Sequence, residues 1–131
     1  MTTEESRETV LGFLAAQGRG DAEAMRRLTA DDLRWEPPGS VFAPVQGREA
    51  VFEAMAKAGA ENFDLSTMEV EVDGIVAEGD KVVLLQRMKC RTTRGTDYSN
   101  VYCWVYTCAD GRVVRMQEFT DSQRFRDLVI G

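Results

Sequence analysis

A hairpin near the end of the sequence constrains the fold of this chain more than any other feature. Two runs of alternating apolar and polar residues, Tyr98–Cys108 and Arg112–Thr120, flank the turn sequence Ala109-Asp110-Gly111. An Asp-Gly pair between two such runs is typical of an antiparallel β-hairpin. An isolated hairpin is only marginally stable in water, so we expect the two strands to belong to a larger sheet with one face covered.

Length and charge limit what the chain can be. At 131 residues and 44% hydrophobic content, the sequence predicts a single domain, residues 1–131, with a core of useful size. The net charge is −6, from 22 acidic and 16 basic residues without a basic run, which argues against nucleic acid as a partner. No apolar stretch is long enough for a signal peptide or a membrane span, so we expect a soluble cytoplasmic protein that does not bind membranes.

Two residue types narrow the possible chemistry. The sequence has no histidine, which excludes a histidine-based metal site and the common catalytic triads. Its three cysteines are odd in number and lie on predicted strands, so we expect reduced thiols: Cys90, Cys103, Cys108. Proton transfer would therefore use another ionisable side chain, and no metal or cofactor is implied.

Helical patterns fill the first half of the sequence. Thr2 stands three residues before Glu5, a capping box for a helix over about residues 3–17. Asp21 is expected to cap a short second helix. The apolar positions of the first helix are Val10, Phe13 and Leu14. After the second helix we expect a connector over 29–32 and a short strand over 33–36. The strand should end at Pro37-Pro38-Gly39, because proline cannot donate to a sheet, and a loop should follow up to Gly47.

A third helix is predicted from Arg48 to about Ala60, closed by Gly59 or Asn62. Its inward residues are predicted to be Val51, Phe52, Met55 and Ala56. From Phe63 onward the pattern is that of β-strands. The predicted strands before the hairpin are Phe63–Asp73, Ile75–Glu78 and Lys81–Arg91, with a turn at Asp73-Gly74.

The alternation slips between Leu65 and Met68, which predicts a bulge that curves the sheet. A curved antiparallel sheet wrapped around three N-terminal helices is cone-shaped. Helices followed by strands indicate the α+β class, with the helices gathered on one face of the sheet.

Three segments carry a resemblance to a known family: FLAAQGRGDAEAMRRLTADDLRWEPPGS, QGREAVFEAM and GRVVRMQEFTD. Together they resemble the nuclear transport factor 2-like superfamily, in particular its SnoaL-like, ketosteroid-isomerase-like and limonene-epoxide-hydrolase-like members. The resemblance covers nearly the whole chain. It implies a conical α+β barrel with an apolar internal pocket and a homodimer formed through the outer sheet face. It does not fix the activity, because members include isomerases, epoxide hydrolases, polyketide cyclases, dehydratases and binding proteins.

The ketosteroid-isomerase pattern is not kept at the positions that the resemblance assigns. It would place an oxyanion-hole tyrosine at Phe13, a catalytic base at Pro37 and a protonated aspartate near Cys103. Glu36 could replace the base by a shift of one residue, but that shift turns its side chain to the other strand face.

The limonene-epoxide-hydrolase pattern is half kept. The resemblance places Arg87 and Glu118 at two of its charged positions, whereas Lys89 stands where the family has an aspartate. Alternation gives Arg87 and Lys89 one face of their strand, and Met116 and Glu118 one face of theirs. If both faces point into the cone, Arg87 would pair with Glu118 and tune its pKa. The alternative is an exposed pair of little energetic weight.

The candidate catalytic residues are therefore Glu118, Arg87 and Asp121, although a helix cap is the stronger expectation for Asp121. The candidate ligand-binding residues are Trp35, Asn100, Met116, Phe13 and Met55. For Trp35, Phe13, Met55 and Met116 plain core packing is equally compatible with the pattern. Strict alternation groups Asn100 with an aromatic stripe that we expect on the outer, dimer-forming face: Tyr102, Trp104, Tyr106. Cys103 is expected to be a small buried apolar residue rather than a nucleophile.

The sequence leaves three functions open. The first is an enzyme for a small apolar, polyketide-like molecule, in which Glu118 serves as base or acid in an isomerisation, cyclisation, dehydration or epoxide opening. The second is a module that binds a small hydrophobic ligand without turning it over. The third is an interaction protein whose interior is a packed core.

Overall fold

The computed structural model describes residues 1–39 and 42–131. Three helices and two strands come first: α1 (Thr3–Gly18), α2 (Ala22–Arg27), β1 (Thr29–Glu36), β2 (Val45–Gln46) and α3 (Arg48–Asn62). The remaining elements are β3 (Phe63–Glu78), β4 (Lys81–Thr92), β5 (Asp97–Ala109), β6 (Arg112–Thr120), α4 (Ser122–Phe125) and a π-helical turn, η1 (Arg126–Ile130). This order confirms the predicted α+β class. No helix in the described ranges combines the length and the apolar character that a bilayer crossing needs.

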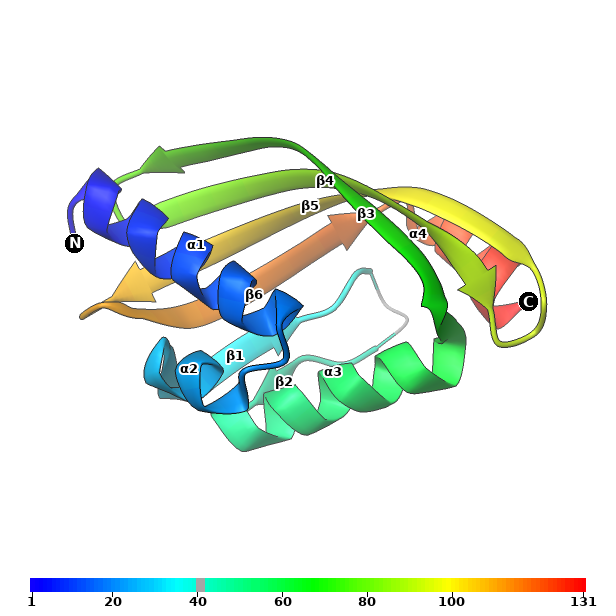
Figure 1. The fold of residues 1–131 in the computed structure, drawn as a ribbon, viewed down its shortest axis with the longest axis horizontal. Helices are drawn as coiled ribbons and strands as arrows, with labels where there is room; N and C mark the ends of the chain where they lie inside the picture. The colour runs from blue at the N-terminus through cyan, green and yellow to red at the C-terminus, as the bar shows by residue number, and fades with distance from the viewer. Residues whose placement is uncertain (40–41) are drawn as a thin grey trace.

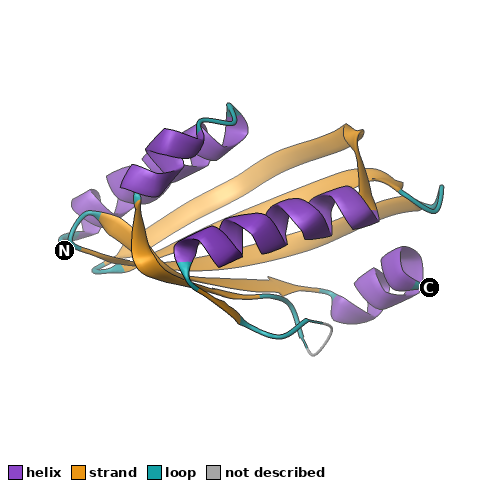
Figure 2. Cartoon of the chain, turned by 90° about the horizontal axis from the view of Figure 1, so that it is seen from below, coloured by secondary structure: helices purple, strands orange, loops and turns teal. Residues whose placement is uncertain are grey.

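One sheet of six strands, in the order β2-β1-β6-β5-β4-β3, curves around the helices (Figure 1). The prediction of a wholly antiparallel sheet is wrong at one place, because β1 pairs with β6 in parallel. Helix α3 contacts β1 and β2 near one edge of the sheet and β3 at the other, and α1 contacts strands β3 to β6 (Figure 2). We call the face that carries α1 and α3 the inner face and the opposite one the outer face.

The hairpin predicted around Asp110-Gly111 is present as β5 and β6. Asp110 has φ 52° and Gly111 has φ 75°, so both central turn residues adopt the left-handed conformation of the two-residue turns that suit a twisted hairpin. The strands pair from Tyr102 opposite Thr120 to Ala109 opposite Arg112. This pairing fixes which side chains of β6 share a face with those of β5.

Several local predictions in the connections need correction. Residues 29–32 are part of β1 rather than a connector, and the predicted loop up to Gly47 contains β2, while residues 40–41 of that loop lie outside the described residues. The predicted bulge is confirmed by a register break between Asp64 and Glu69. A second break spans Val72 to Gly74, so the Asp-Gly pair there bends a continuous strand instead of ending it.

Both long helices are fastened to the turns at opposite ends of the sheet. The capping box of Thr2 and Glu5 forms as predicted. The Ser6 hydroxyl then donates to the Gly79 carbonyl at 2.7 Å, and the Gly79 N–H donates to the Thr3 hydroxyl at 2.8 Å. At the other end, the Thr93 N–H after β4 donates to the Asn62 carbonyl at the end of α3 at 3.0 Å.

The inner face is filled by two separate groups of buried side chains. The first group includes Phe13, Leu33, Leu84, Tyr106 and Met116, and the second includes Met88, Tyr98, Tyr102, Phe125 and Val129. Trp104 packs against both groups. The aromatic stripe predicted for the outer face therefore points inward, because its alternation was assigned to the wrong side of the sheet. Ala56 on α3, predicted inward, is exposed, while Val51 on the same helix is fully buried.

Candidate functional site

Glu118 on β6 lies on the inner face, directly opposite Trp104 of β5. The parallel pairing of β1 with β6 places Trp35 beside Met116, which lies two residues before Glu118 on β6. From there the Trp35 indole Nε1–H donates to Glu118 Oε1 at 3.0 Å. The carboxyl group is thus held by one defined donor, which lies 83 residues earlier in the sequence.

Burial changes the acidity of Glu118. Removal from water raises the pKa of this carboxyl from 4.5 to about 7, and the hydrogen bond from Trp35 opposes that rise in part. Solvent still reaches part of the residue, although protein surrounds it on most sides. A carboxyl that exchanges a proton near neutral pH and remains reachable has the properties of a general acid or base.

The surroundings of Glu118 are aromatic and almost uncharged. Trp35, Tyr102 and Tyr106 are all less than 10% exposed, and burial raises the pKa of both tyrosine hydroxyls far above their usual value. The nearby charge of Glu118 adds to both of these rises. Such a site favours apolar molecules and strengthens any interaction with the carboxylate.

The predicted pair between Arg87 and Glu118 is wrong. Strand register puts Arg87 opposite Val101 of β5, on the outer face, whereas Glu118 is opposite Trp104 on the inner face. Arg87 instead contacts Asp73 and Glu71 of β3, each at 3.0 Å. These exposed pairs raise the pKa of Arg87, chiefly through the hydrogen bonds to Asp73. Lys89 is exposed and pairs with Glu69 at 3.1 Å.

Asp121 acts as a helix cap, which was the stronger expectation for it. Its carboxylate accepts a hydrogen bond from the Arg124 N–H at 3.0 Å and so begins helix α4. The structure does not bring this side chain together with Glu118: it lines a hollow described below, whose other charged residues are on the outer face.

Asn100 faces inward with the aromatic stripe. Its amide is fully occupied within the protein: Nδ2 donates to the Tyr98 hydroxyl at 2.7 Å and to the Asp121 carbonyl at 3.0 Å, and Oδ1 accepts from the Val101 N–H at 2.8 Å. The Tyr98 and Tyr102 hydroxyl oxygens lie 2.7 Å apart. Asn100 therefore ties the start of α4 to the buried tyrosines, and its amide nitrogen has no hydrogen left to donate to a ligand.

The other predicted ligand-binding residues differ in how far they are buried in the core and in whether they contact Glu118. Phe13 and Met116 are 1% and 0% exposed, respectively, and belong to the packed core. Met55 on α3 is half-buried against the same core. Trp35 is buried as well, but its indole N–H contacts Glu118 directly, so among these residues it has the clearest link to the candidate site.

Other ionisable groups lack the properties of Glu118. Glu36 is held by Arg115 at 3.0 Å, and this hydrogen bond lowers its pKa, as expected for a structural ion pair. The cysteines are free, and burial raises the pKa of the Cys108 thiol to about 11. Within residues 1–39 and 42–131, no three acidic or cysteine side chains gather as a metal site would require.

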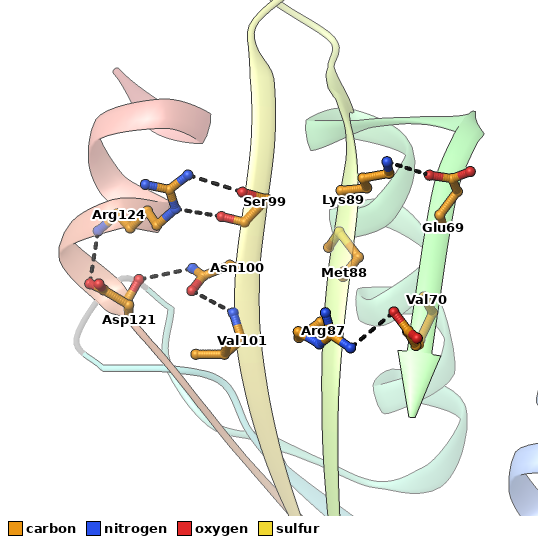
Figure 3. Close-up of a pocket in the computed structure, with 11 residues that line it drawn as sticks. Glu69, Val70, Arg87, Met88, Lys89, Ser99, Asn100, Val101, Asp121 and Arg124 are labelled. Atoms are coloured by element: carbon orange, nitrogen blue, oxygen red, sulfur yellow. Dashed lines mark hydrogen bonds and ion pairs between the residues drawn. The ribbon is translucent and has the colours of Figure 1, made fainter. Parts of the chain in front are cut away.

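A hollow of about 780 Å³ lies on the outer side of strands β3 to β5, next to the start of α4 (Figure 3). Its charged side chains are mostly paired with one another. The residues that line it are Glu69, Val70, Glu71, Arg87, Met88, Lys89, Ser99, Asn100, Val101, Asp121 and Arg124. Because the sheet separates the charged outer-face side chains of this hollow (Glu69, Glu71, Arg87 and Lys89) from Glu118, we place the candidate chemistry on the inner face.

Sequence reasoning missed Val72 and Gln86, which lie with Trp104 and Glu118 on the inner face between the two buried groups. We call Val72, Gln86, Trp104 and Glu118 the inner band. All four remain at least partly accessible to solvent, whereas Leu84 and Met88, on either side of Gln86, are 2% and 8% exposed. A polar residue at an inward position between two buried apolar ones was the available signal for Gln86.

Comparison with known proteins gives a consistent result. A family profile described as the SnoaL-like domain matches residues 10–116. A nuclear transport factor 2-like protein of Burkholderia xenovorans LB400 is similar in structure, with a TM-score of 0.83, 23% identity and 98% coverage of both chains.

Two further solved structures are similar. One, from Jannaschia sp. CCS1, is named a SnoaL-like polyketide cyclase, with a TM-score of 0.82, 23% identity and coverage of 97% of this chain and 92% of that one. The other is an LEH-like epoxide hydrolase of M. tuberculosis, with a TM-score of 0.72, 20% identity and coverage of 98% and 91%, respectively. At this level of identity the structures establish the fold alone. No curated protein matches the chain.

Proposed function

Because this chain belongs to the SnoaL-like domain family, we propose that it is an enzyme that transfers a proton to or from a small apolar molecule, with Glu118 as the acid or base. The observation that carries the proposal is the state of Glu118. It is a carboxyl group with a pKa near 7, held by one indole donor and surrounded by aromatic side chains.

The geometry suggests how the two carboxyl oxygens divide the work. Trp35 donates to Oε1, so Oε2 is left to accept a proton from a carbon or hydroxyl group of the ligand. The proton taken up by Oε2 can be returned to another atom of the same molecule, which restores the carboxylate. An isomerisation, cyclisation or dehydration needs this cycle, and an epoxide opening can use the carboxylate to take a proton from water. The similarity to structures named a polyketide cyclase and an epoxide hydrolase supports this range of reactions.

A probe reaction tests the proposal without knowledge of the natural substrate. In 5-nitrobenzisoxazole, a base removes the proton on C3, the N–O bond breaks, and a coloured 2-cyano-4-nitrophenolate forms. We expect the protein to accelerate this reaction above free acetate at equal concentration, with a rate that rises as pH increases through about 7, because the ionised carboxyl is the base.

The matched variants are Glu118→Gln and Glu36→Gln. Glu118→Gln keeps size and hydrogen-bonding capacity but cannot accept a proton, so the rate should fall by about 10²–10⁴-fold. Glu36→Gln removes a carboxyl from the neighbouring strand β1 and should leave the rate within about twofold of the unmodified protein. Equal rates for Glu118→Gln and the unmodified protein would contradict the enzyme proposal and favour a ligand-binding module.

A further inference from the structure

The inner face of β3 is unusually open in its middle. Val70 and Val72 stand opposite Met88 and Gln86 of β4, which places both valines on the helix-covered side of the sheet. They are nevertheless 51% and 54% exposed. Met68 before them is half-buried against the second buried group. Solvent therefore reaches the inner face between the places where that strand is packed.

The inner-facing residues after the valines are packed again. Ile75 and Ala77 are half-buried and lie against the first buried group. The exposed stretch of β3 thus coincides with the boundary between the two groups. This boundary is the line along which the inner band runs from Val72 to Glu118.

Gln86 occupies the middle of that line. Its cross-strand neighbours are Val72 on β3 and Tyr102 on β5. In the part of the chain that the structure describes, the Gln86 amide makes no hydrogen bond to another protein group, while the residue as a whole is half-buried. Neither amide atom is a buried atom without a partner, so solvent reaches the amide and a ligand on the inner face can take the place of that water.

We propose that Gln86 orients the ligand of the inner band by a hydrogen bond to a neutral oxygen, a carbonyl or hydroxyl group, at the end of the molecule remote from Glu118. This proposal rests on the proposed function, because it assumes that the ligand lies against Glu118. Strands β4 and β6 are separated by β5, so the two side chains emerge from strands roughly 10 Å apart. The ligand class that spans this distance is an elongated, mostly apolar ring system with an oxygen at one end.

The chemistry of the band narrows the class further. An amide can donate to a carbonyl and accept from a hydroxyl, but it offers no charge to neutralise a carboxylate. An anionic ligand would also be repelled by the ionised form of Glu118. Neutral oxygenated ring compounds are therefore preferred over acids of the same size.

Two naphthalenes matched in shape test the assignment. 2-Acetylnaphthalene carries a carbonyl oxygen, and 2-isopropylnaphthalene replaces it with a methyl group. Titration calorimetry should give tighter binding of the ketone relative to the hydrocarbon than their partitioning into octanol predicts. Gln86→Leu should weaken ketone binding by roughly 2- to 12-fold, the range for one lost hydrogen bond, and leave hydrocarbon binding equal or stronger.

Gln117→Leu is the matched control, because Gln117 lies on the outer face opposite Val105 and should change neither affinity. The proposal is overturned if Gln86→Leu weakens both ligands equally, if it changes neither, or if neither ligand binds the unmodified protein. The outcome is distinguishable from failure of the proposed function. Ketone selectivity that depends on Gln86, without proton transfer by Glu118, leaves Gln86 as the orienting residue of a binding protein. Proton transfer without that selectivity removes the role of Gln86 alone.

Discussion

At the scale of single residues, Glu118 makes the stability of the protein depend on pH in an uncommon direction. The pKa of its carboxyl is about 7 in the folded protein and 4.5 in the unfolded chain, so the folded state binds the proton more tightly. The stabilisation from this group is complete below pH 4.5 and is lost as pH rises towards and past 7. The separation of the two pKa values corresponds to about 3 kcal/mol.

We therefore expect Glu118→Gln to gain stability relative to the unmodified protein as pH rises from 4.5 to 8, by up to about 3 kcal/mol. Urea unfolding at several pH values measures this difference. Glu36→Gln should show the opposite trend, because the hydrogen bond to Arg115 lowers the pKa of Glu36 and its stabilisation is lost on acidification. Parallel stability curves for Glu118→Gln and the unmodified protein would show that the Glu118 carboxyl is not buried as described.

The sequence could identify Glu118 but not its partners. The resemblance to limonene-epoxide-hydrolase-like members nominated it, and alternation placed it on the same face of its strand as Met116. Which side chains of β4 share a sheet face with Glu118 depends on how β4 and β6 each pair with β5. No local sequence pattern predicts that register. Arg87 was therefore assigned to the wrong face, and Gln86, one residue away, was overlooked. The Trp35 contact depends on the pairing of β1 with β6, two strands that are far apart in the sequence.

At the scale of elements, α4 depends on Asp121 for its first turn. Asp121→Ala should destabilise the protein by about 1 kcal/mol, because the Arg124 N–H loses its partner. Asp121→Asn keeps a side-chain oxygen at the same place and should cost much less. Urea unfolding of the two variants gives the comparison. If Asn and Ala were equally harmful, the negative charge rather than the cap would be the important property of Asp121.

Elements defined by local chemistry were predicted well. The capping box of α1, the Asp21 cap of α2 and the Asp-Gly turn of the hairpin each depend on neighbouring residues, and each is present. The errors lie where the fold overrides a local preference. Asp73-Gly74 has the composition of a turn, yet the pairing of β3 with β4 continues past it. Residues 29–32 lack an apolar run, yet Thr29 already pairs with Val113 of β6.

At the scale of the whole molecule, the outer face presents an apolar row that water does not favour. Leu85, Cys103 and Phe119 are direct cross-strand neighbours on β4, β5 and β6. Leu85 and Phe119 are 42% and 52% exposed, and Val101 nearby is 59% exposed. We propose a homodimer through this row, in place of the aromatic stripe that the sequence suggested and that the structure buries.

Sedimentation of the unmodified protein and two variants tests this assembly. Phe119→Asp should convert a dimer at tens of micromolar into a monomer, because it puts a charge into the apolar row. Leu11→Asp is the matched control: Leu11 lies on α1 and is 43% exposed, and its replacement should leave the dimer intact. A monomeric unmodified protein would contradict the proposal.

The parallel pairing of β1 with β6 has a consequence for the order in which the molecule is made. A ribosome releases β1 early, but the strand that β1 pairs with along its length emerges after β3, β4 and β5 have been synthesised. Until then the apolar side chains of β1 and α1 have no completed sheet against which to pack. Because contacts between distant parts of a chain form slowly, we expect the hairpin strands to pair first and the N-terminal segment to dock last. We therefore expect the contact between Trp35 and Glu118 to form late in folding.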